Sequence, residues 1–173
     1  MDLQLIFVVE TDSKTKSDWI YIKDTIDCFY TYDQSHIKFS PVYMAGKGNY
    51  KKVEGKILKL ISDYAAVNNQ RQSKVIYCFD SDDFDTNRVD MDFLESAKEY
   101  CDEKQYDFIW FCKDVERVYL GRKVAEKQKA KEAAKFKSGK LIKKVNRTSL
   151  EITRYTANTS NILRVIDKYL KRK

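Results

Sequence analysis

Residues 3–10 read LQLIFVVE, and this stretch decides the fold of the chain. Its near-continuous apolar run is typical of a strand that is covered on both faces of a sheet. Residues 74–79 (KVIYCF) repeat the pattern and lead into Asp80-Ser81-Asp82, as the first run leads into Glu10. Strands buried on both faces predict an α/β protein with helices on either side of a central sheet.

Strand and helix patterns alternate along the first 112 residues. Apolar residues at three- and four-residue spacing predict helices between the strands, and Pro41 favours an edge position for its own strand or the end of that strand. We expect strands at 3–9, 37–43, 74–79 and 106–112, and helices at about 19–30, 50–64 and 91–103. This order predicts a largely parallel sheet of about four strands with right-handed crossovers.

The pattern changes after Cys112, where the chain becomes rich in Lys and Ala. Apolar spacing and helix propensity predict three further helices, at 114–121, 122–137 and 157–170. No linker is evident in this part of the chain. We therefore expect an α/β domain over residues 1–121 and a basic, mostly helical extension over residues 122–173, packed on the same domain.

The net charge of +7 is unevenly distributed. Residues 1–112 carry 14 Lys and Arg against 20 Asp and Glu, a net −6, whereas residues 113–173 carry 19 against 6, a net +13. A strongly basic end favours a polyanionic partner such as nucleic acid, although a solvated helix surface would look similar. The residues that suit phosphate contact lie in one polar segment with Tyr155: Lys140, Lys143, Lys144, Arg147 and Arg154.

Several protein classes are excluded or disfavoured by composition. His36 is the single histidine, which excludes a multi-histidine metal site, and no Gly-rich loop has P-loop spacing. The four cysteines form no CxxC pair and are expected to be buried, reduced thiols. No apolar run approaches the roughly 20 residues of a membrane span, and the N-terminus lacks signal-peptide features. We expect a cytoplasmic protein without membrane association.

Acidic residues follow two of the expected strands. Glu10 follows the first, and Asp80 and Asp82 follow the third. In a parallel α/β sheet, ligands bind beyond the carboxyl ends of the strands, and alternation in an extended segment would put Asp80 and Asp82 on the same side. Carboxylates packed closely repel one another unless a cation lies between them. Mg²⁺, which prefers oxygen ligands, would suit such a site.

This arrangement resembles the Toprim domain, as found in topoisomerases, bacterial primases, M5-type ribonucleases and OLD-type nucleases. The matching residues are Leu5-Ile6-Phe7-Val8-Val9-Glu10 and Val75-Ile76-Tyr77-Cys78-Phe79-Asp80-Ser81-Asp82. The resemblance covers residues 3–112. In its size and its basic C-terminal end, the chain most resembles the RloB-like Toprim proteins of prokaryotic defence or mobile-element loci. The position of Lys47-Gly48-Asn49, in a loop before the second expected helix, also suits that comparison. The resemblance implies a Toprim-like three-layer sandwich.

The resemblance also implies roles for the acids. Glu10 would be a general acid/base or a metal ligand, and Asp80 and Asp82 would bind Mg²⁺ or Mn²⁺. Asp83 and Asp85 could support these ligands or hold a second metal ion. One departure is Thr11, where the family often has glycine. The alternative is that residues 80–85 form a capped, solvated turn and that Glu10 merely begins a loop.

The resulting hypothesis is a Mg²⁺-dependent nuclease, or a related phosphoryl-transfer enzyme, acting on DNA or RNA. Lys47 and Lys113 would contact phosphate, and Glu116 could extend the acidic group; equally, Lys113 and Glu116 could belong to a helix N-terminus capped by Asp114. A non-catalytic nucleic-acid-binding module on a Toprim scaffold is the main alternative. A protein-interaction module is another, with a homodimer or a second protein as the partner.

Overall fold

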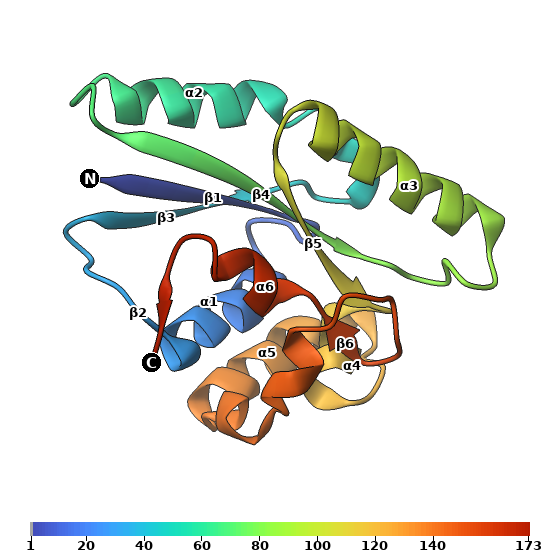
Figure 1. Ribbon diagram of the computed structural model, residues 1–173. Coiled ribbons are helices and arrows are strands. Elements are labelled where there is room, and N and C mark those ends of the chain that lie inside the picture. The colour runs from blue at the N-terminus through green and yellow to red at the C-terminus, as the bar shows by residue number, and fades with distance from the viewer. Residues whose placement is uncertain (1) are drawn as a thin grey trace.

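A five-stranded sheet forms the centre of the protein in the computed structural model, which describes residues 2–173 (Figure 1). The strand order is β3-β1-β4-β5-β6. The first four strands of that order are parallel, and β6 runs antiparallel to β5. Their bounds are β1 Leu3–Val9, β3 Ile37–Tyr43, β4 Gln72–Asp80, β5 Asp107–Cys112 and β6 Thr159–Ser160.

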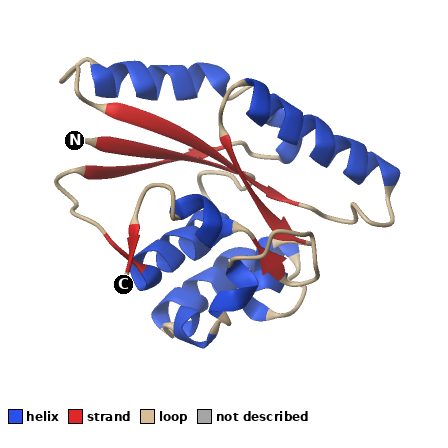
Figure 2. Ribbon diagram, viewed as in Figure 1, coloured by secondary structure: helices blue, strands red, loops and turns tan. Residues whose placement is uncertain are grey.

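Helices cover both faces of the sheet, which gives three layers (Figure 2). One face carries α2 (Glu54–Ala65) and α3 (Arg88–Glu103). The other carries α1 (Ser17–Phe29), α4 (Val115–Leu120), α5 (Lys129–Ser138) and α6 (Ile162–Ile166). The mostly parallel sheet and the layered α/β architecture predicted from the sequence are therefore confirmed.

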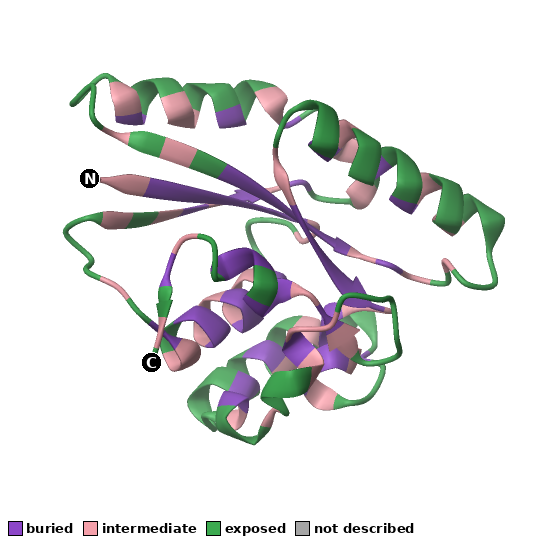
Figure 3. Cartoon of the chain, viewed as in Figure 1, coloured by how far each residue is buried: buried purple, intermediate pink, exposed green. Residues whose placement is uncertain are grey.

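Strand β1 explains why the first apolar run is nearly unbroken. Leu5, Phe7 and Val9 pack into the core beneath α1, α5 and α6, whereas Ile6 and Val8 pack into the core beneath α2 and α3. The five residues from Leu5 to Val9 are wholly inaccessible to solvent, and β1 is buried purple along almost its whole length in Figure 3. Both faces of the strand therefore need apolar side chains.

Pro41 lies on β3, which is the edge strand that the sequence predicted. The N–H of Met44, three residues later, donates to the Val9 carbonyl of β1 (2.8 Å). Because backbone groups of alternate residues point to opposite sides of a strand, position 41 faces away from β1. Proline has no N–H to offer there, so it removes no hydrogen bond from the sheet.

The extension (residues 122–173) packs into the same core as α1. Phe136 of α5 is fully buried, with its ring 4.9 Å from the ring of Tyr21 and 5.6 Å from that of Tyr119. At the end of the chain, β7 (Lys171–Arg172) pairs antiparallel with β2 (Tyr30–Thr31). The Tyr30 hydroxyl donates to the Leu163 carbonyl at 2.9 Å. These contacts join the extension to α1 and its following strand.

The structure corrects the prediction for the end of the chain. The helix expected at 157–170 is confined to α6, and β6 adds a fifth strand that was not predicted. The reason is the open edge of β5, whose backbone groups need partners. Ser160 donates to the Trp110 carbonyl (2.7 Å), and the Asn161 amide bonds Phe108 and Trp110. Residues 159–161 are therefore held along β5 and cannot be helical.

Other helix boundaries also differ from expectation. The extension contains less α-helix than expected, because α5 begins at Lys129 and not at 122. Between the two expected helices, where none was predicted, the chain forms 3₁₀ turns at Leu141–Lys144 and Arg147–Leu150. Helix α2 begins at Glu54 and not near Tyr50, because a 3₁₀ turn at Lys47–Asn49 intervenes. The cap suggested for Asp114 is confirmed in α4, where its side chain accepts from the Arg117 N–H (2.8 Å).

Within residues 2–173, no helix combines the length and the apolar character that crossing a membrane requires.

The packing of Phe136 yields a first prediction. Phe136→Ala should lower the free energy of unfolding by about 3–5 kcal/mol, because it leaves a cavity between α1 and α5. Urea denaturation followed by circular dichroism measures this change. Lys131→Ala, at an exposed position of the same helix, should alter stability by less than about 0.5 kcal/mol. Equal stability of both variants would contradict the packing of the extension against α1.

Candidate functional site

Glu10 and Asp80 meet at the carboxyl end of the central strands. Glu10 directly follows β1, and Asp80 is the last residue of β4, its parallel neighbour. The Asp80 N–H donates to Oε1 of Glu10 at 2.8 Å. The Asp80 carboxylate in turn accepts from the Val115 N–H at the start of α4 (3.0 Å). The structure thus brings together two of the three acids singled out in the sequence.

Two further acids complete a group that we call the acidic cluster: Glu10, Asp18, Asp80 and Glu116. Asp18 lies in the first turn of α1 and accepts from the Thr11 N–H (3.2 Å). Glu116 lies in α4 with a side chain only 1% exposed, and its Oε1 has no hydrogen-bond partner among the described residues. Glu116 could be singled out from the sequence, but Asp18 could not. No local sequence signal indicated Asp18, because only the packing of α1 places it beside the loop after β1.

Burial and mutual repulsion hold protons on this cluster. Burial, with the Asp18 charge next in importance, raises the pKa of Glu10 to about 8. Burial likewise raises the pKa of Asp18 to about 6 and that of Glu116 to about 7. For Asp80, burial and the adjacent Glu10 raise the pKa well above its ordinary value. Fully ionised, the cluster would carry more negative charge than its surroundings neutralise, and the raised pKa values favour the protonated forms instead.

Lys129 is the cation that the extension supplies to the cluster. It is the first residue of α5, and its ammonium lies 3.7 Å from Glu116 and 3.4 Å from Glu126. Burial disfavours this charge, yet Glu116 and Asp80 together raise the pKa of Lys129 above its ordinary value. Neither the composition nor the spacing of residues 122–137 had indicated Lys129.

A cavity of about 280 Å³ opens onto these groups. Its walls come from the loop after β1, the end of β4 and the start of the extension, and they include Glu10, Thr11, Asp18, Asp80, Glu126 and Lys129. Gly46, in the loop after β3, closes one side, and its N–H donates to the Glu10 carbonyl at 2.9 Å. Its φ of 115° is a conformation that other residues rarely adopt.

Asp82 lies apart from this hydrogen-bonded group. Strand β4 ends at Asp80, and the backbone turns at Asp82 with a φ of 48°. The alternation expected to continue through Asp82 therefore stops. Its carboxylate pairs with Lys47 at 2.5 Å, and Lys47 also contacts Asp90 at 3.1 Å. The charge of Asp82 still helps to raise the pKa of Glu10.

The remaining predicted residues divide into two groups. Asp83 and Asp85 are exposed and pair with Lys113 at 2.9 and 3.4 Å, so Lys47 and Lys113 are both engaged with aspartates. The five basic residues of the extension that were predicted to bind nucleic acid are exposed, and none of these five forms an ion pair within residues 2–173: Lys140, Lys143, Lys144, Arg147 and Arg154. They are free to meet an external anion.

No protein-family model, curated protein or solved structure matches this chain. Within the part of the chain that the structure describes, no three His, Cys, Asp or Glu side chains form a group that could hold a metal ion by themselves. The chemistry of the acidic cluster must therefore be argued from its own geometry.

The raised pKa of Glu10 predicts how stability depends on pH when a chelator removes divalent ions. The ordinary pKa is 4.5, and the folded-state pKa is about 8. Between these values the folded chain holds the proton more tightly than the unfolded chain, so the free energy of unfolding should fall as pH rises. Glu10→Gln removes this pH dependence. The free energy of unfolding of the variant, measured relative to that of the wild type, should therefore increase by on the order of 2–4 kcal/mol from pH 5 to pH 8.

Chemical denaturation at pH 5, 6.5 and 8 in EDTA measures that difference. Glu103→Gln, which removes an exposed carboxyl at the end of α3, should follow the wild-type curve at every pH. A constant difference between Glu10→Gln and the wild type across this range would mean that Glu10 is ionised throughout it.

Proposed function

We propose that the acidic cluster is the divalent-cation site of a Toprim-like enzyme that breaks phosphodiester bonds in nucleic acid. One observation carries the proposal: Glu10 and Asp80 are hydrogen-bonded to each other at the carboxyl ends of adjacent parallel strands, the place where open α/β sheets bind ligands. Both carboxyls have raised pKa values there.

The donor set suits a hard cation that keeps part of its water. Mg²⁺ is commonly bound by one or two carboxylates, with waters and substrate phosphates as the other ligands. Glu10 and Asp80 line the same cavity, and the charge of Glu10 helps to raise the pKa of Asp80, so these two carboxylates could be the protein ligands of such a site. When bound, Mg²⁺ or Mn²⁺ would polarise a phosphate oxygen and offset the charge that develops during displacement.

The chain's own groups have distinct roles in this proposal. In the metal-free chain Glu10 has a pKa of about 8, and it would release its proton when it binds the cation together with Asp80. Asp80 is oriented by the Val115 N–H and would hold the cation. Lys129 would offset the charge of Glu116 beside the site. Asp18 fixes the loop after β1 through its contact with the Thr11 N–H.

The basic extension favours a nucleic acid over a small phosphate ester. Residues 113–173 carry a net +13, and exposed lysines and arginines without carboxylate partners would gain most from neutralising phosphates. The exposed residues Lys140, Lys143, Lys144, Arg147 and Arg154 would therefore contribute affinity. Lys47 and Lys113 would have to exchange their aspartate partners for phosphate.

A non-catalytic nucleic-acid-binding module is the second candidate. It is favoured by the two lysines that already neutralise acids in and near the site, Lys129 beside Glu116 and Lys47 beside Asp82. In such a module the cluster would be structural and the extension alone would bind nucleic acid. Binding without cleavage under all metal conditions would support this alternative.

Cleavage assays separate the two candidates. Wild-type protein with Mg²⁺ or Mn²⁺ should cut at least one substrate in a panel of single- and double-stranded DNA and RNA. Glu10→Gln and Asp80→Asn should lower the rate by about 100-fold or more, because each removes a group in direct contact with the reaction. Glu103→Gln should cut at the wild-type rate.

Two results would oppose the nuclease proposal. One is an uncut panel under both metals. The other is cleavage that survives in Glu10→Gln and Asp80→Asn, which would trace the activity to another site or to a contaminant. Circular dichroism of each variant, and its affinity for the same oligonucleotides, would show that folding and binding are intact.

A further inference from the structure

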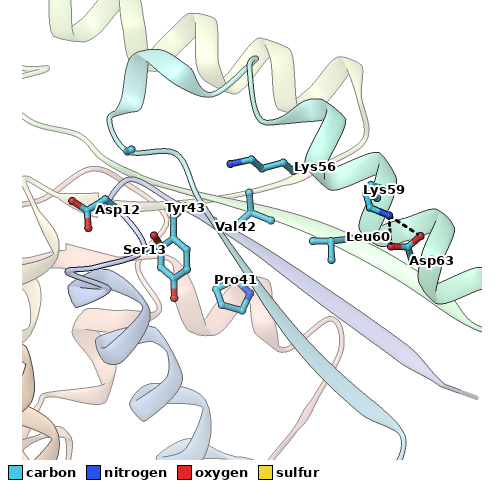
Figure 4. A pocket seen from close by; sticks show the side chains of 10 residues that line it. Asp12, Ser13, Pro41, Val42, Tyr43, Lys56, Lys59, Leu60 and Asp63 are labelled. Carbon is cyan, nitrogen blue, oxygen red and sulfur yellow. Dashed lines mark hydrogen bonds and ion pairs between the residues drawn. The ribbon is translucent and has the colours of Figure 1, made fainter.

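A second cavity lies at the open edge of the sheet, beside β3 (Figure 4). We call it the edge hollow. Its volume is about 460 Å³, within the range of about 300–1,000 Å³ that is typical of small-molecule pockets. Pro41 and Tyr43 of β3 and Leu60 of α2 supply its apolar surface, and Lys56 and Lys59 of α2 project beside it.

The edge hollow adjoins the cavity of the acidic cluster. Asp12 and Ala45 line both cavities, so a ligand that extends past these two residues would reach from one into the other. Asp12 follows Glu10 by two positions, and the neighbouring Gly46 N–H is bound to the Glu10 carbonyl (2.9 Å). A chain molecule with a phosphodiester at Glu10 and Asp80 would therefore have its next unit at the edge hollow.

The charges of the edge hollow leave one cation unpaired. Asp63 pairs with Lys59 at 3.0 Å. Asp12 accepts from the N–H groups of Lys14 and Thr15, at 2.8 and 2.7 Å. Lys56 is exposed and has no carboxylate partner within residues 2–173. The surface thus combines an aromatic ring and apolar side chains with one free ammonium, which complements a base joined to a phosphate.

A peptide strand is a poorer occupant of this edge. An added strand would need hydrogen bonds from the outward backbone groups of β3, and Pro41 faces outward there without an N–H. Proline on an edge strand is a common means of blocking such pairing. A ligand could therefore contact the side chains at this edge, but a peptide could not pair with β3 as a regular additional strand.

We propose that the edge hollow binds an unpaired nucleotide next to the scissile phosphodiester, with its base against Tyr43 and Pro41 on one side of β3 and a phosphate at Lys56 on the other side, where Leu60 also lies. This inference rests on the proposed function and names its substrate class: a single strand, or an unpaired segment of a folded nucleic acid. A base held in a duplex would have its faces covered by its neighbours and could not lie against Tyr43.

Photo-crosslinking and binding in EDTA test the assignment without relying on cleavage. The probes are ten-nucleotide single strands of DNA and RNA that carry 5-iodouracil at one position, and the full chain is used. Irradiation should crosslink Tyr43, identified by mass spectrometry of the digested protein. Tyr43→Leu should weaken binding about tenfold, since one base–aromatic contact is lost, while Tyr43→Phe should bind as the wild type does.

Charge reversal provides a matched pair of variants. Lys56→Glu should weaken binding several-fold more than Lys51→Glu, whose ammonium lies over the rings of Tyr50 and Tyr100, outside the edge hollow. The corresponding duplex should show no dependence on Tyr43.

The outcomes are distinguishable from those of the cleavage assay. Crosslinks at Tyr43 with the expected losses of affinity support the edge hollow as a nucleotide site, even if no substrate is cut. Crosslinks that map only to other residues, or Tyr43→Leu and Lys56→Glu variants that bind like the wild type, overturn it, even if cleavage depends on Glu10. Occupation of the edge hollow by a peptide or by a second copy of the chain, with oligonucleotide binding unaffected, would also overturn it.

Discussion

The hydrogen bond from the Asp80 N–H to the Glu10 carboxylate is the contact on which the rest of the site depends. It exists because β1 and β4 are parallel neighbours, so that their carboxyl ends come together in the middle of the sheet. Two acids in contact, partly withdrawn from water, are costly unless they hold protons or meet a cation. The raised pKa values of Glu10 and Asp80 result from this unfavourable burial of neighbouring charges.

The extension links the core to the site through a single helix. Phe136, near the end of α5, is buried against Tyr21 and Tyr119, and Lys129, at the start of the same helix, approaches Glu116. Packing at one end of α5 therefore positions a charge at the other. A cation bound between Glu10 and Asp80 would share the neutralising role of Lys129.

Much of this architecture could be predicted from the sequence because it depends on local patterns. The unbroken apolar run of β1 indicated a strand covered on both faces, Pro41 indicated an edge, and Asp114 indicated a helix start. The last helix was overestimated because the pairing of Ser160 with the exposed edge of β5 is not a local property. The turn at Asp82 was missed because aspartate tolerates positive φ better than most residues do, but does not require it.

Three of the four acids in the acidic cluster could be singled out from the sequence, and Asp18 could not. Glu10 and Asp80 follow apolar strands, and strand order then brings them together. Asp18 and Lys129 lie on helices whose sequences give no sign of the site, and only the tertiary packing of α1 and α5 places them beside it. The excess of basic residues after residue 112 indicated a polyanion, yet it did not single out the one lysine that reaches the cluster.

The central claim is that Glu10 and Asp80 together bind a divalent cation. Anomalous diffraction from crystals soaked in Mn²⁺ tests it most directly. The account predicts an anomalous peak within ligand distance of a carboxylate oxygen of both residues, and its absence from Glu10→Gln crystals treated in the same way. Wild-type crystals with no peak at these two carboxylates, at Mn²⁺ concentrations that label other sites, would contradict it.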